Sequence, residues 1–156
     1  MTHLAKARAL ALGLPAALMA GALGSQYIGG LYPCEMCHWQ RWPHDTAIVA
    51  ALFAFGTRSQ RAAYWLIWFA ALAILTSGLI GAFHAGVEYG WWPGLTTCAS
   101  TANGTTIEAI MNAPIVRCDV PQWTLFGISL AGFNALLSIG GALVILTLLS
   151  RRNGQA

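Results

Sequence analysis

Four stretches of the chain are almost entirely apolar, and polar residues gather between them. Three charge-free runs, residues 9–32, 62–83 and 123–149, each exceed the roughly 20 residues that a helix needs to cross a bilayer. A fourth run around residues 46–55 is too short alone, but a helix over 37–56 would measure roughly 30 Å. The pattern predicts an all-α membrane protein, a four-helix transmembrane bundle with spans at about 9–32, 37–56, 62–83 and 123–149.

The composition agrees with a membrane protein and not with a soluble one. The chain of 156 residues is 57% hydrophobic and 8% charged, whereas soluble domains have roughly 25% charged residues. Lys6, Arg8 and the small residues 20–22 also imitate a signal peptide. However, the apolar run continues to Tyr32, and signal peptides have apolar regions of only about 7 to 15 residues, so we expect a permanent span.

The basic residues predict the orientation, because short cytoplasmic loops collect Lys and Arg. Six of the eight lie in the two tails and in the turn between the second and third spans: Lys6, Arg8, Arg58, Arg61, Arg151 and Arg152. Both termini are therefore predicted to be cytoplasmic, with a short outer loop at about 32–37 and a long one at 84–122. All four cysteines then lie outside, where disulfides persist. No basic surface that would suggest a nucleic-acid partner remains.

Two further features concern packing and the long loop. Gly13, Gly21, Gly78 and Gly81 are expected to let helix backbones approach closely in lipid. The loop is rich in Gly, Thr, Asn and Pro, which favours irregular structure. The apolar residues of segment 107–112 allow either a short helix lying flat on the bilayer or plain loop.

Cys34 and Cys37 form a Cys-x-x-Cys motif, which is compatible with a redox dithiol, half a zinc site or haem attachment. The zinc interpretation is disfavoured because Cys98 and Cys118 do not form a second close pair. The haem interpretation has direct support, because His38 completes the Cys-x-x-Cys-His pattern. It leaves little chain for a haem pocket, since the motif lies at the head of a helix. A membrane-anchored c-type cytochrome is therefore kept as the alternative.

The redox interpretation also explains Arg41. A thiolate is favoured at a helix N-terminus and beside a cation. At 3.6 residues per turn, the two cysteines of the motif, Arg41 and either His44 or Asp45 share one helix face. Pro43 leaves open whether the helix includes the motif or begins near Trp42.

Arg41 is a functional candidate because a cation at the membrane boundary is costly. Its structural alternatives are to extend outward to solvent or to pair with Asp45. A cation beside a dithiol at this depth suits an electron acceptor dissolved in lipid, whose oxygen it would stabilise. The sequence therefore predicts that a quinone is the acceptor.

The chain resembles the bacterial disulfide bond formation protein B (DsbB) family over nearly its whole length. The resemblance rests on three segments in relation to four spans: Pro33-Cys34-Glu35-Met36-Cys37-His38-Trp39-Gln40-Arg41, Gly81-Ala82-Phe83-His84-Ala85-Gly86-Val87-Glu88, and Cys118-Asp119-Val120-Pro121-Gln122-Trp123 with Phe126-Gly127-Ile128-Ser129. It implies an enzyme of the bacterial inner membrane that reoxidises a periplasmic DsbA-like thiol oxidase. The electrons would pass to the membrane quinone pool, either ubiquinone or menaquinone.

The resemblance also implies roles for individual residues. Cys34 and Cys37 would form the quinone-coupled disulfide, with Cys37 facing the ring, and Cys98 and Cys118 would form the disulfide that faces the partner. Arg41 and His84 would help to hold the quinone, and no metal is expected.

The sequence departs from better-known members of this family in the short interval between Cys98 and Cys118 and in His38. His84 has a structural alternative, which is to cap the outer end of the third span. Arg117 and Glu88 are interpreted as solvated loop charges. A noncatalytic bundle braced by disulfides is a further alternative. A vitamin K epoxide reductase-like enzyme is disfavoured, because the extra span of that family is not seen.

Overall fold

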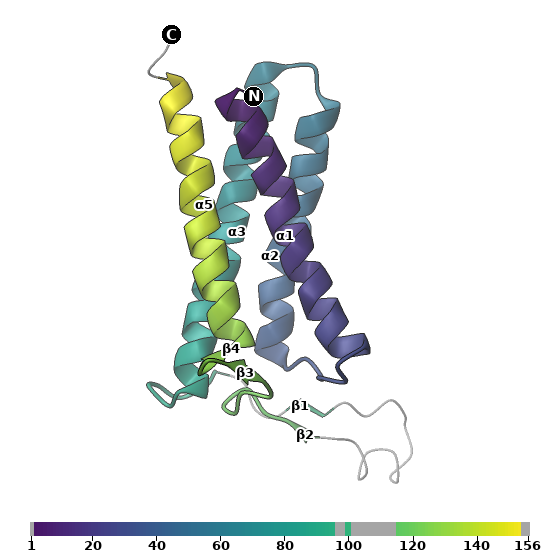
Figure 1. The fold of residues 1–156 in the computed structure, drawn as a ribbon, viewed down its shortest axis with the longest axis vertical. Helices are drawn as coiled ribbons and strands as arrows, with labels where there is room; N and C mark the ends of the chain where they lie inside the picture. The colour runs from purple at the N-terminus through teal and green to yellow at the C-terminus, as the bar shows by residue number, and fades with distance from the viewer. Residues whose placement is uncertain (1, 96–98, 101–114, 154–156) are drawn as a thin grey trace.

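Four long helices lie side by side in the computed structural model, which describes residues 2–95, 99–100 and 115–153 (Figure 1). The helices are α1 (His3–Tyr27), α2 (Glu35–Gly56), α3 (Gln60–Glu88) and α5 (Leu130–Asn153). The start of α1, the end of α5 and the turn between α2 and α3 lie at one end of the bundle, and the strands lie at the other (Figure 1). The element considered at 107–112 lies outside the described residues.

Three of these helices, α1, α3 and α5, are long and apolar enough to cross a membrane. Helix α2 is not in this group, because its outer half carries Glu35, Arg41 and Asp45. Its 22 residues nevertheless correspond to about 33 Å, similar to the thickness of the hydrocarbon layer. The structure is therefore that of a helical membrane protein, while the fourth span and the side on which the termini lie stay predictions.

The ends of the helices follow from local chemistry. Thr2, Cys34 and Ser59 precede α1, α2 and α3, and the side chain of each accepts a hydrogen bond from the backbone N–H three residues later. Helix α2 runs without interruption from Glu35 through Pro43, so the dithiol motif lies at its N-terminus and not in an extended lead-in. Helix α1 ends at Tyr27, five residues before the apolar run does, and Gly30 follows with a φ of 68°.

A small hairpin replaces the first part of the fourth predicted span. Strands β3 (Thr124–Leu125) and β4 (Ile128–Ser129) pair in antiparallel register around Phe126 and Gly127, whose φ values are 51° and 76°. Two positive φ values in a two-residue connection are typical of a type I′ turn. Tyr89, which follows α3, donates its hydroxyl hydrogen to the Gly127 carbonyl at 2.9 Å and accepts from the Ser129 N–H at 3.1 Å. The hairpin is thus attached to the end of α3.

A second pair of strands belongs to the long loop between α3 and α5, which is predicted to be the outer one. Strand β1 (Ala99–Ser100) pairs in antiparallel register with β2 (Ile115–Val116). Ala99 lies opposite Val116, so the two arms of the loop meet two residues before Cys118.

Small residues let α3 pack closely against α5. A Cβ atom added at Gly78 would lie 3.0 Å from the backbone nitrogen of Ile139, and one added at Gly81 would lie 3.0 Å from the Ala131 carbonyl oxygen. No such contact exists at Gly13, where a Cβ atom would meet nothing within 4 Å. The predicted close approach is therefore confirmed for the two glycines of α3 but not for those of α1, since Gly21 is equally open.

Gly78→Ala is expected to lower the thermal unfolding temperature of the protein in detergent. Overpacking a tight contact costs about 1 to 3 kcal/mol, which exceeds the roughly 0.5 to 1 kcal/mol that alanine gains over glycine in a helix. Gly13→Ala is the matched control and is expected to leave the unfolding temperature unchanged or to raise it. Equal unfolding temperatures for the two variants would contradict the close α3–α5 contact.

Candidate redox site

Cys34 and Cys37 lie together at the N-terminus of α2. Cys34 is the N-cap residue, and its Sγ accepts the N–H of Cys37 at 3.3 Å. The two Sγ atoms are 2.9 Å apart. The positive end of the helix dipole favours a negative charge at this position, as a thiolate requires. The geometry is that of a dithiol ready to form or open a disulfide.

The pKa of the Cys34 thiol is raised, first by its hydrogen bond with Cys37 and second by burial. A raised pKa means that Cys34 keeps its proton at neutral pH. Its side chain is only 2% exposed, whereas Cys37 is partly exposed. In the reduced protein, Cys37 is therefore the sulfur that is available as the nucleophile.

Alkylation of the reduced protein by iodoacetamide near neutral pH is expected to modify Cys37 well before Cys34, because only a thiolate reacts at an appreciable rate. Peptide mass spectrometry after short exposure measures the ratio of the two products. Unfolded protein serves as the control, in which both cysteines are expected to react at similar rates. Faster labelling of Cys34 in the folded protein would show that the assignment of the nucleophile is wrong.

Cys118 of the long loop reaches the same place. Residues 116–119 alternate between buried and exposed, as in a strand with one face on the core, so that Val116 and Cys118 point inward. These two residues belong to a buried cluster that also contains Cys34, Met36 and Val87. The Sγ atoms of Cys34 and Cys118 and a ring nitrogen of His84 all lie within 4.8 Å of one another. The sulfur of the outer loop therefore lies next to the sulfur of the dithiol.

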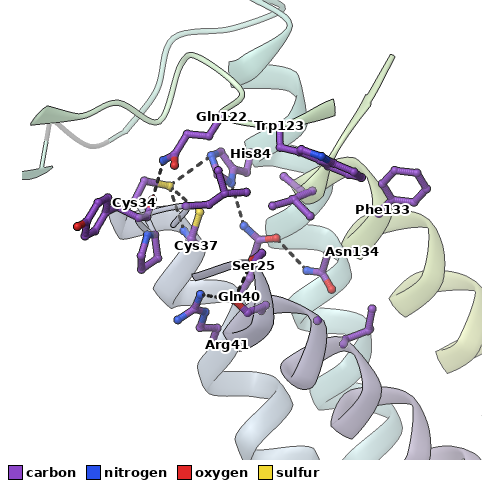
Figure 2. A pocket seen from close by; sticks show the side chains of 18 of the residues that line it. Ser25, Cys34, Cys37, Gln40, Arg41, His84, Gln122, Trp123, Phe133 and Asn134 are labelled. Carbon is purple, nitrogen blue, oxygen red and sulfur yellow. Dashed lines mark hydrogen bonds between the residues drawn. The ribbon is translucent and has the colours of Figure 1, made fainter. Parts of the chain in front are cut away.

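His84 lies beside this pair of sulfur atoms. Its side chain is 2% exposed, its Nε2 is 3.6 Å from Cys34 Sγ, and its Nδ1 is 2.9 Å from Gln40 Nε2 (Figure 2). Glu88, one turn later on α3, approaches the same Nε2 at 3.8 Å. His84 is thus a buried neighbour of the dithiol and does not act as a solvent-facing helix cap.

Arg41 lies one turn along α2 from Cys37 and faces α1. Its guanidinium donates to Gln26 Oε1 at 2.6 Å and to the Ala22 carbonyl oxygen at 3.3 Å. Asp45, the acidic partner considered from the sequence, is exposed and forms no salt bridge with Arg41. The cation is therefore held by neutral groups and keeps its charge for another negative or polar group.

A cavity of about 250 Å³ connects these residues. Cys34, Cys37, Arg41 and His84 all line it, and Figure 2 shows them grouped around one space. Part of its remaining lining is apolar and comes from α1 and from the start of α5: Ala17, Leu18, Met19, Ala22, Leu130, Ala131 and Phe133. The cavity brings sulfur, a cation and an apolar surface together at the end of the bundle opposite the turn between α2 and α3.

Several residues of the site were not identified from the sequence. Gln40 and Asn134 join α2 to α5 through a 2.9 Å hydrogen bond beneath His84 (Figure 2). Gln122 donates to the Tyr32 carbonyl oxygen at 2.6 Å and holds the second loop over the first. An available signal was the presence of Gln and Asn within apolar helices, because buried polar side chains in a membrane are costly.

Two charged residues differ in their environments. Arg117 is exposed and pairs with Asp119 at 2.6 Å, as expected of a solvated loop charge, although it also lines the cavity. Glu88 does not fit that interpretation: its side chain is 8% exposed and accepts a hydrogen bond from the hydroxyl of Ser129. It fastens the start of α5 to the end of α3.

His38 is a predicted residue that lies away from the cavity, and Cys98 is one that the structure does not describe. His38, which completes the haem attachment pattern, is exposed on α2 and does not line the cavity. Cys98 lies outside the described residues, and its pairing with Cys118 stays a prediction. Cys34, His84 and Cys118 are spaced so that they could hold a metal ion, a possibility that the sequence did not indicate.

Comparisons with known proteins identify the family of the chain. The sequence model described as disulfide bond formation protein DsbB matches residues 5–148. The chain belongs to the DsbB family. It is 33% identical to disulfide bond formation protein B of Paracidovorax citrulli over 151 residues, covering 86% of this chain and 81% of the relative. The similar protein of Verminephrobacter eiseniae is 30% identical over 145 residues, covering 86% and 80%.

A third relative carries no functional name. The uncharacterized protein RP370 of Rickettsia prowazekii is 31% identical over 122 residues, covering 74% of this chain and 70% of the relative. No solved structure matches the chain. Membership of the DsbB family supports disulfide bond formation as the function and a disulfide-forming oxidoreductase as the class of enzyme.

Proposed function

We propose that this protein reoxidises a periplasmic thioredoxin-like thiol oxidase and passes the electrons to quinone in the bacterial inner membrane. One observation carries the proposal: Cys118 of the outer loop lies against Cys34, whose dithiol partner Cys37 lines a cavity that contains a cation. A path for electrons therefore runs from the outer loop into the apolar bundle through sulfur atoms alone.

The cavity fits the head of a quinone by size and chemistry. A cavity of about 150 Å³ holds benzene in an apolar protein core, so about 250 Å³ can hold a substituted ring. Arg41 offers hydrogen-bond donors, which a quinone oxygen needs as an acceptor. The walls from α1 and α5 are apolar, as a lipid-soluble tail requires. Arg41 and Cys37 would hold the ring, with His84 beneath Cys34.

The proposed cycle begins at the outer disulfide between Cys98 and Cys118. A thiolate of the reduced partner attacks Cys98, and a second partner thiol resolves the mixed disulfide. The partner leaves oxidised, and the loop holds a dithiol. Cys118 then attacks Cys34 of the inner disulfide, so that Cys37 leaves as a thiolate. Cys98 attacks Cys118 in turn, which restores the outer disulfide and releases Cys34 to take up a proton.

In the second half of the cycle, the inner disulfide between Cys34 and Cys37 forms again. Cys34 keeps its proton because its pKa is raised, and Cys37 is left as the anion beside Arg41. Quinone supplies the oxidant: it accepts two electrons and two protons as the inner disulfide forms again. The direction follows from this final acceptor, because 30 mV is worth about 1.4 kcal/mol for a two-electron couple.

The test is a quinone reduction assay with purified protein in detergent, a reduced thioredoxin-like protein and a short-chain quinone. We expect one quinone to be reduced for each partner dithiol oxidised, and we expect Cys34→Ser/Cys37→Ser protein to be inactive. Loss of partner thiols without reduction of quinone would overturn the choice of acceptor. Absence of both reactions would overturn the proposed function as a whole.

The same preparation separates the two rival sites. A c-type cytochrome would show haem absorbance, but His38 is exposed and lies outside the cavity. A zinc site would use the cluster of Cys34, His84 and Cys118 and would require thiolates as ligands. Stoichiometric zinc in protein purified without reductant would favour this rival, whereas our proposal expects oxidised thiols there.

A further inference from the structure

A network of hydrogen bonds joins α2, α3 and α5 below the dithiol. Three backbone carbonyls in it determine which side-chain groups donate and which accept. A carbonyl oxygen can only accept, so each partner must donate. Gln40 Nε2 donates to the Met36 carbonyl at 3.1 Å. Ser77 Oγ donates to the Gln40 carbonyl at 2.7 Å, and Asn134 Nδ2 donates to the Ser77 carbonyl at 3.2 Å. The orientation of both amide side chains follows from these contacts.

The orientation of the Gln40 amide in turn determines which ring nitrogen of His84 carries the hydrogen. The second hydrogen of Gln40 Nε2 points to His84 Nδ1 at 2.9 Å, so this ring nitrogen accepts. The hydrogen of the neutral ring is then on Nε2, facing Cys34 Sγ. Gln40 Oε1 accepts from Asn134 Nδ2 at 2.9 Å, which leaves Asn134 Oδ1 as an acceptor.

The same reasoning applies to His44, a buried histidine of α2. Its Nε2 lies 2.9 Å from Asn134 Oδ1 and 2.9 Å from Ser77 Oγ. Asn134 Oδ1 can only accept, and the hydroxyl hydrogen of Ser77 is already donated to a carbonyl. His44 Nε2 must therefore carry a hydrogen, and in the neutral ring His44 Nδ1 then presents a lone pair.

His44 Nδ1 is buried and has no hydrogen-bond partner among the described residues. The side chain is only 3% exposed, so bulk solvent does not satisfy this nitrogen. A buried acceptor without a donor is costly, and each such group in a folded protein calls for an explanation. His44 also lines the cavity, three residues along α2 from Arg41. His44 thus adds one unsatisfied acceptor to a set of lining residues that includes the strong donors of Arg41.

This combination distinguishes the two redox states of a quinone. Both oxygens of a quinone are acceptors, which suit Arg41 but cannot satisfy His44 Nδ1. A quinol carries two hydroxyl groups, each of which can donate. An unsatisfied acceptor on a side chain that lines the cavity therefore favours the reduced ring over the oxidised ring.

We propose that His44 Nδ1 accepts a hydrogen bond from a hydroxyl of quinol and is a positioning residue for the reduced product. The inference rests on the proposed function. In the net reaction, the Cys34–Cys37 dithiol and quinone give the disulfide and quinol, and both thiol hydrogens appear as quinol hydroxyls. Stabilising the quinol relative to the quinone makes the bound quinone a stronger oxidant of the dithiol.

The test compares the binding of tetramethyl-1,4-benzoquinone and its quinol to protein in the Cys34→Ser/Cys37→Ser background, where no electron transfer occurs. His44→Gln removes the Nδ1 acceptor, while the glutamine amide can still reach Asn134. We expect the quinol dissociation constant to rise about five-fold and that of the quinone to change less than two-fold. This selective loss corresponds to a fall of about 20 mV in the midpoint potential of the bound couple.

A control variant and two contrary outcomes separate failure of this inference from failure of the proposed quinone site. Asp45→Asn alters an exposed neighbour and is expected to change neither dissociation constant. An unchanged quinol dissociation constant in His44→Gln, or an equal loss for both ring states, would overturn the inference while leaving the proposed function intact. Failure of both ring states to bind even with His44 present would instead overturn the proposed quinone site.

A second measurement keeps His44 in place, in case the glutamine variant does not fold. The chain has four histidines, so His3→Gln/His38→Gln protein retains only His44 and His84. Nitrogen-15 spectra of this protein, in the same serine background, are expected to show both imidazoles protonated at Nε2. Quinol should shift one Nδ1 resonance and quinone should not. A His44 ring protonated at Nδ1, or no response to quinol, would overturn the inference.

Discussion

Cys118→Ser is expected to reduce partner-driven quinone reduction by at least roughly 10³-fold, the largest effect of any single substitution that we consider. Cys118 Sγ is the loop sulfur that lies against Cys34, and a hydroxyl cannot replace a thiolate in disulfide exchange. Initial rates of quinone reduction, measured with reduced partner in excess, give the size of the loss.

The control for Cys118→Ser is a single turnover that bypasses the loop. When the inner dithiol is first reduced with dithiothreitol and the reagent is then removed, the variant is expected to reduce one quinone per protein. Turnover with the partner within ten-fold of the unmodified protein would show that electrons reach Cys34 by another route. Loss of the single turnover as well would indicate damage to the cavity and not to the relay.

Arg41→Met is expected to raise the Michaelis constant for quinone roughly 10- to 100-fold, with a smaller change in kcat. Hydrogen bonds to a charged group contribute about 1.5 to 3 kcal/mol, and this cation is held by neutral groups on α1 while it lines the cavity. Steady-state kinetics over a range of quinone concentrations separate the two constants.

Arg58→Met is the matched control for Arg41→Met, because it removes an arginine from the turn between α2 and α3, at the opposite end of the bundle. This variant is expected to keep an unchanged Michaelis constant. If Arg41→Met lowered only the yield of folded protein, with normal kinetics for the remainder, Arg41 would have a structural role alone.

The dithiol part of the site could be predicted from the sequence, because it depends on the regular spacing of one helix. Cys37 and Arg41 are four residues apart, and an α-helix brings such residues onto one face. The choice between His44 and Asp45 depended on which neighbours pack against α2. The structure buries His44 against α3 and α5 and leaves Asp45 exposed.

The contacts between distant segments could not be predicted in the same way. Nothing local to Cys118 indicates that it lies against Cys34, because that contact depends on how a loop folds back over the bundle. The hairpin before α5 was also missed, since residues 124–129 are nearly as apolar as the helix that follows. Periodicity alone cannot separate a short apolar strand from the start of a helix. Its turn, with positive φ at Phe126, is stabilised by contacts to Tyr89, which is distant in sequence at the end of α3.

The tethering of Cys118 has a consequence for selectivity. Only residues 119–123 separate it from β3, and Gln122 in this short segment is bonded to the carbonyl of Tyr32. A thiol on such a short tether has an effective concentration in the millimolar range or higher toward Cys34. Small thiols diffusing in the surroundings would need comparable concentrations to intercept the exchange. The shortness of segment 119–123 would thus protect the inner disulfide from exchange with small thiols.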